Sequence, residues 1–92
     1  MKKHIVITGK VQGVGYRYWL YKKAIERNVV GWVRNKVSGE VEVLLVGNDV
    51  DINNLIQMCE KGSPLSKVTK IKVQNYQEGF IKESFNIIND DG

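Results

Sequence analysis

The spacing of the apolar residues constrains the fold of this 92-residue chain more than any other feature of its sequence. Apolar side chains recur at every second position around Ile5, Val43 and Ile71, a pattern that predicts strands. They recur at every third or fourth position after Arg17 and Asp49, a pattern that predicts amphipathic helices. The chain is long enough for one hydrophobic core and too short for two. We therefore expect a single domain over residues 1–92.

The predicted order is strand, helix, strand, strand, helix, strand. We expect a first strand that includes His4 and runs to Gly9, a helix at about residues 17–28, strands at 29–35 and 40–46, a helix capped by Asn48 or Asp49 and ending at Gly62, a strand at 69–74 and a short last strand with Phe85 and Ile87. This order is typical of the α+β class and its ferredoxin-like α/β sandwich (βαββαβ). An antiparallel sheet would carry both helices on one face.

The predicted topology brings two distant segments to one edge of the sheet. The first and second strands point the same way, so the loop after Gly9 and the end of the second strand at Asn35 lie at the same edge. The third strand lies between them, which sets a gap of roughly 10 Å. A long side chain could span much of that distance.

The loop at this edge has the composition of an anion site. Gly13 and Gly15 allow successive backbone N–H groups to converge, and the following helix adds the positive end of its dipole. Arg17 in the first helical turn is then mildly unfavourable unless an anion accepts it. A tight turn followed by a surface arginine explains these residues equally well. Two known nucleotide loops do not fit, because Tyr18 stands where a dinucleotide loop needs glycine and Val11 where a P-loop needs Ser or Thr.

The remaining reactive side chains give few alternatives for catalysis. The single histidine, His4, starts the first strand at the end opposite the loop, and the single cysteine, Cys59, falls in the apolar stripe of the second helix. We expect both to be structural, and we expect helix capping or solvation for the carboxylates Asp49, Asp51, Asp90 and Asp91. The sequence thus predicts no metal site and no cofactor. Arg17, Asn35 and backbone amides remain, a set that can bind an anion and orient a water.

Charge and cysteine content bear on partners and compartment. Fourteen Lys and Arg against ten Asp and Glu give a net charge of +4, which favours anionic ligands. An RNA-binding module with the same order of elements is disfavoured, because residues 40–46 carry two glutamates and no stacking aromatic residue. The N-terminus lacks the apolar core of a signal peptide, and the lone Cys59 fits a reducing compartment, so we expect a cytoplasmic protein.

Two segments of the chain resemble the acylphosphatase family. Residues 9–17, GKVQGVGYR, are similar to its first signature, and residues 31–35, GWVRN, with Gly39 and Val41, are similar to its second. The resemblance implies a metal-independent enzyme that hydrolyses the carboxyl–phosphate bond of acyl phosphates by direct attack of a water. It implies that Arg17 and a loop of Gln12, Gly13, Val14 and Gly15 bind the phosphate, and that Asn35 positions the water.

The same resemblance leaves a second reading open. Acylphosphatase-like domains also begin larger hydrogenase-maturation proteins, so a non-catalytic phosphate-binding or acyl-phosphate-binding module is the alternative. In either case we expect a small-molecule acyl phosphate as ligand, inorganic phosphate or sulfate as anions that occupy the site, and no nucleic acid or membrane as partner. We expect a monomer.

Overall fold

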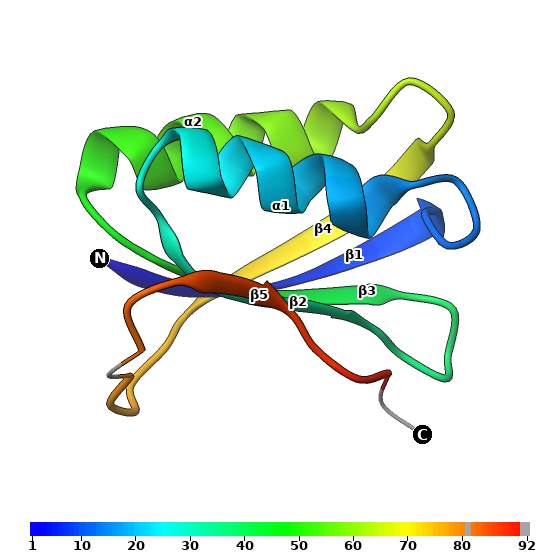
Figure 1. Ribbon diagram of the computed structural model, residues 1–92. Helices are drawn as coiled ribbons and strands as arrows, with labels where there is room; N and C mark the ends of the chain where they lie inside the picture. The colour runs from blue at the N-terminus through cyan, green and yellow to red at the C-terminus, as the bar shows by residue number, and fades with distance from the viewer. Residues whose placement is uncertain (81, 91–92) are drawn as a thin grey trace.

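A five-stranded sheet with two helices on one face forms the computed structural model, which describes residues 1–80 and 82–90 (Figure 1). Its elements are β1 (Lys2–Lys10), α1 (Tyr16–Glu26), β2 (Val30–Asn35), β3 (Val41–Val46), α2 (Asp49–Lys61), β4 (Lys67–Asn75) and β5 (Phe85–Ile87). The strands lie in the order β4-β1-β3-β2-β5. The ferredoxin-like α+β arrangement is confirmed, with β3 between β1 and β2.

The direction of the last strand differs from the prediction. The first four strands pair antiparallel, but β5 runs parallel to β2, with Phe85 opposite Gly31 and Ile87 opposite Val33. The chain after β4 therefore crosses to the far edge of the sheet before it forms β5. Alternation of apolar residues tells which face a strand buries and carries no information on its direction, so the sequence could not reveal this pairing.

The core lies between the sheet and the helices. Alternate residues of the central strands, such as Ile5 and Ile7 of β1, are fully buried, and Leu20 of α1 and Leu55 of α2 pack against them. Among the helices of the described residues, none is long and apolar enough to cross a membrane.

The ends of the helices have identifiable causes. The side chain of Asn48 accepts a hydrogen bond from the Asp51 amide at 2.9 Å, so the predicted cap of α2 is confirmed. Helix α1 ends at Glu26, two residues before the predicted end. Asn28 has a φ of 55°, and a residue in this left-handed conformation terminates a helix, for which asparagine is among the favoured side chains.

The opposite face of the sheet carries a charged network. Glu42 of β3 is 8% exposed, and its carboxylate is hydrogen-bonded to His4 Nε2 of β1 at 2.6 Å and accepts a bond from Arg34 Nε of β2 at 2.6 Å. The Arg34 guanidinium also lies 5.2 Å from the ring centre of Trp32. Burial alone would raise the pKa of Glu42, but the bonds to His4 and Arg34 outweigh it and lower that pKa. This network joins three adjacent strands.

Strand β4 forms one edge of the sheet. Most of its residues are exposed, and three of them are lysines, Lys67, Lys70 and Lys72. Charged residues, lysine above all, are a common means of keeping an edge strand from pairing with another chain.

Candidate active site

The predicted meeting of two distant segments is present in the structure. Strands β1 and β2 are both antiparallel to β3, so the C-terminal ends of β1 and β2 lie at the same end of the sheet. The β1–α1 loop and the β2–β3 hairpin project there side by side (Figure 1). A cavity of about 210 Å³ lies there. Its lining residues are Val11, Gln12, Gly13, Gly15, Tyr16, Arg17, Tyr18, Asn35 and Ile87.

The loop backbone depends on two glycines. Gly13 has a φ of 73° and Gly15 a φ of 78°, a region in which other residues are strained. A Cβ at either position would meet no atom within 4 Å, so the constraint is backbone conformation and not space. Gly15 stands at the N-cap of α1 and supplies no side-chain cap. The first-turn N–H groups of α1, which have no acceptor within the helix, are therefore available to an anion at the cavity.

Two of the predicted loop residues use their side chains for other contacts. Gln12 Nε2 donates to the carbonyl oxygens of Lys36 and Glu40, each at 2.8 Å, and so ties the loop to the β2–β3 hairpin. Val14 is not among the residues that line the cavity, and its side chain packs against the core. If these two residues bind phosphate, they do so with backbone N–H groups.

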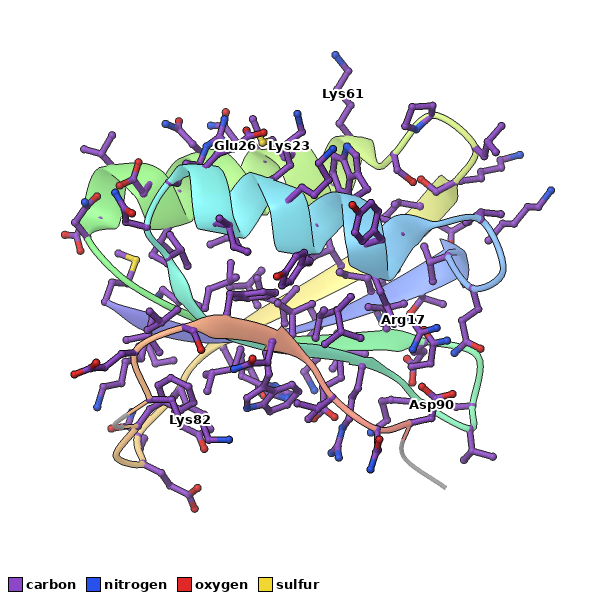
Figure 2. All side chains as sticks on the ribbon, in the orientation of Figure 1. Arg17, Lys23, Glu26, Lys61, Lys82 and Asp90 are labelled. Atoms are coloured by element: carbon purple, nitrogen blue, oxygen red, sulfur yellow. The ribbon has the colours of Figure 1, made fainter. Side chains whose placement is uncertain are left out.

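Arg17 extends from the first turn of α1 toward the end of the chain, where it meets Asp90 (Figure 2). Its Nη1 donates to Asp90 Oδ1 at 3.0 Å, and the two side chains are 37% and 61% exposed. Asp90 is thus largely exposed to solvent, as expected, but it also pairs with Arg17, a contact that the sequence does not predict. After β5 the chain reaches the end of the sheet where Arg17 lies, a path that the sequence pattern does not reveal. Asp91, for which we made the same prediction, lies outside the described residues.

Asn35 is the last residue of β2 and faces the cavity from the hairpin side. Its Oδ1 atom is buried and accepts no hydrogen bond from the described residues. Buried acceptors are almost always paired, because an unpaired one costs about 1–3 kcal/mol. An acceptor of this kind beside a cavity is suited to receive a hydrogen bond from a water or a ligand.

Cys59, Tyr16 and His4 carry reactive groups, and all three have structural roles. Burial raises the pKa of the Cys59 thiol to about 12, so the group is neutral and packed at physiological pH, as the sequence predicts. Burial also raises the pKa of Tyr16, whose hydroxyl donates to the Cys59 carbonyl at 2.8 Å and fixes the start of α1 against α2. His4 is engaged by Glu42 on the other face of the sheet.

Potential metal ligands are scattered in the structure. Over residues 1–80 and 82–90, no group of three or more His, Cys, Asp or Glu side chains is close enough to hold a metal ion.

The fold places this chain among the ferredoxin-like α+β proteins, and its candidate site joins a glycine loop, an arginine and an asparagine. The chain belongs to the acylphosphatase family, which it matches over residues 3–87. It is 40% identical to an acylphosphatase of Bacillus licheniformis over 89 residues, 95% of this chain and 97% of the relative. An acylphosphatase of Bacillus pumilus is 39% identical over 84 residues, with 91% and 93% covered.

Solved structures agree with these sequence matches. The crystal structure of the acylphosphatase from Bacillus subtilis superposes with a TM-score of 0.89 at 36% identity, covering 95% of this chain and 97% of that one. A full-length HypF in a phosphate- and nucleotide-bound form superposes with a TM-score of 0.85 at 33% identity, but the match covers only 12% of that longer protein.

Proposed function

We propose that this protein is an acylphosphatase that hydrolyses the carboxyl–phosphate bond of acyl phosphates to a carboxylate and inorganic phosphate. The observation that carries this proposal is the meeting of Arg17, the glycine loop and Asn35 around one cavity. The family and the near full-length relatives support the same reaction.

Arg17 and the loop amides would hold the phosphoryl oxygens. Hydrogen bonds to charged groups contribute about 1.5–3 kcal/mol each, and the guanidinium can present two parallel N–H donors to two oxygens. In the structure, Nη1 of the partly exposed Arg17 side chain is bonded to the carboxylate of Asp90. A doubly charged phosphoryl group that also meets the helix N-terminus would displace this single carboxylate.

Asn35 would place the attacking water. Its buried Oδ1 accepts a hydrogen bond from the water, whose oxygen forms a bond to phosphorus while the bond between phosphorus and the acyl oxygen breaks. The carboxylate leaves with the electron pair of that bond, and a phosphoryl oxygen takes the proton of the water. The acyl phosphate is already activated by its carboxylate leaving group, so positioning and charge stabilisation suffice without a protein nucleophile.

The site also suggests the partners. Inorganic phosphate or sulfate would occupy the same donors as the substrate, and neither nucleic acid nor a membrane is required. We propose a monomer in the cytoplasm, in keeping with the lysine-bearing edge strand β4 and the single buried cysteine.

The alternative is a non-catalytic phosphate-binding module, which the similarity to one part of HypF favours. Turnover separates the two functions. Purified protein should hydrolyse benzoyl phosphate, with inorganic phosphate as a competitive inhibitor. Phosphate binding without turnover of any acyl phosphate would instead support the module.

A further inference from the structure

The lining of the candidate cavity contains both polar and apolar groups. Arg17, Asn35 and the backbone of the loop glycines are polar, whereas Tyr18 of α1 and Ile87 of β5, called here the apolar rim, present exposed apolar surface. Tyr18 is 61% exposed and Ile87 is 41% exposed. Among the large apolar side chains that are exposed in the described part of the chain, these two line this cavity.

The ring of Tyr18 has two neighbours on the surface of α1. It stacks on Tyr21, one helical turn away, with ring centres 6.1 Å apart and planes 19° apart. Lys22 Nζ lies 5.6 Å from the centre of the Tyr18 ring. Contacts that favour one orientation of the ring reduce the conformational entropy that is lost when a ligand covers it.

We propose that Tyr18 and Ile87 form the subsite for the acyl group and favour aromatic or branched acyl phosphates over acetyl phosphate. This inference rests on the proposed function. An acyl phosphate has a charged end and an end that is often apolar, and the lining of the cavity offers polar groups for the first and exposed apolar surface for the second. Tyr18 is the sequence neighbour of Arg17, and Ile87 comes from β5, three residues before Asp90, so the rim lies beside the proposed phosphate donors. An apolar acyl group placed there removes its own surface and that of the rim from water.

Kinetic comparison of two substrates tests the subsite. Values of kcat/KM for benzoyl phosphate and acetyl phosphate are measured for the wild type, Tyr18→Ser, Ile87→Ser and the conservative Tyr18→Phe. Leu65→Ser is the matched control, because Leu65 is 72% exposed and lies in the connection between α2 and β4. Inhibition by inorganic phosphate is measured in parallel as a check on the polar groups of the cavity.

We expect Tyr18→Ser and Ile87→Ser to lower the benzoyl-to-acetyl ratio of kcat/KM by about tenfold, chiefly through KM for benzoyl phosphate. Tyr18→Phe and Leu65→Ser should keep the wild-type ratio. An equal loss of kcat/KM for both substrates would show a general structural role and overturn the subsite. A matching loss of inhibition by phosphate would lead to the same conclusion. If the wild type hydrolyses neither substrate, the proposed function itself is contradicted. If the wild type is active and both serine variants keep its benzoyl-to-acetyl ratio of kcat/KM, the subsite alone is contradicted.

Discussion

Arg17 is subject to two opposing electrostatic effects. Its position in the first turn of α1 costs about 0.3–1 kcal/mol, and its exposed ion pair with Asp90 returns about 0–1 kcal/mol. These effects nearly cancel. We therefore expect Arg17 to contribute little to the free energy of folding, which agrees with its proposed role in binding an anion.

We expect Arg17→Gln to lower kcat/KM by at least about 10³-fold and to leave the phosphate-free unfolding free energy within about 1 kcal/mol of the wild type. Added phosphate should stabilise the wild type more than the variant, because only the wild type binds it well. Denaturant melts with and without phosphate, together with kinetics, measure both effects. Lys23→Gln removes a charge from the last turn of the same helix and serves as the control. A large phosphate-free loss of stability would identify Arg17 as structural.

We expect Asn35→Ala to reduce kcat by about 100-fold, because a water without its acceptor no longer lies in line with the phosphorus. Inhibition by inorganic phosphate should change little, since other groups bind the anion. Steady-state kinetics with phosphate as inhibitor separates the two effects, and Asn53→Ala on the exposed side of α2 is the control. Near-normal turnover would make Asn35 a turn residue.

Some residues of the candidate site could be predicted from the sequence, and others could not. Arg17 and Asn35 stand in local patterns whose chemistry is recognisable, and the predicted topology brings them together. Asp90 and Ile87 reach the site because β5 lies beside β2, a pairing between distant segments. No local pattern encodes that pairing, so both residues were missed.

At the scale of elements, hydrogen bonds tie the β1–α1 loop to the β2–β3 hairpin. The side-chain amide of Gln12 bonds two hairpin carbonyls, and Asn35 begins the same hairpin. Gln12 thus helps to fix the position of the loop relative to Asn35, which we propose as the water acceptor. The sequence places Gln12 in the loop but does not tell which way its side chain is directed.

We expect Gln12→Ala to lower kcat by about tenfold or more, because small displacements of positioned groups are costly in rate. Loss of two neutral hydrogen bonds should destabilise the fold by about 1–3 kcal/mol. Kinetics and urea melts give both numbers, and Gln57→Ala on the outer face of α2 provides the comparison. A variant that loses stability but keeps full kcat would show that the tie does not position the site.

Glu42 links β1, β2 and β3, and its lowered pKa makes the fold sensitive to acid. A carboxyl group whose pKa is lower in the folded protein stabilises the fold at any pH above its pKa in the unfolded chain, near 4.5. This stabilisation is lost as the pH falls through the pKa of the folded protein. We expect Glu42→Gln to be about 1–3 kcal/mol less stable at pH 7 and to show a flatter loss of stability below about pH 4.5. Chemical melts across this range measure it. Parallel pH curves for the two proteins would contradict this role.

The elements themselves were largely predictable, for reasons that differ between them. Alternation identified β1 and β3, because alternate residues of both strands belong to the core beneath the helices, and it identified β4, whose Ile71 packs against that core. The end of α1 was misplaced, since Asn28 falls on the apolar arc but adopts a left-handed backbone. Periodicity reports where a side chain would lie if the helix continued, and it cannot report that the helix has stopped.

For the whole molecule, we expect catalysis to survive exhaustive chelation. Of the described residues that line the cavity, none carries a carboxylate, imidazole or thiol, the usual ligands of catalytic metals. Activity on benzoyl phosphate after treatment with EDTA, with and without added magnesium or zinc, tests this expectation. A loss that either metal restores would require a different mechanism.

The lysines of β4 have a consequence for the behaviour of the protein at high concentration. Lys67, Lys70 and Lys72 stand along a nine-residue edge strand, where another copy could otherwise dock and extend the sheet. Pairing of two copies along β4 would place the two backbones about 5 Å apart and bring their lysine side chains close together. The mutual repulsion of the ammonium groups would oppose this association, and high salt or lysine acetylation would weaken that protection.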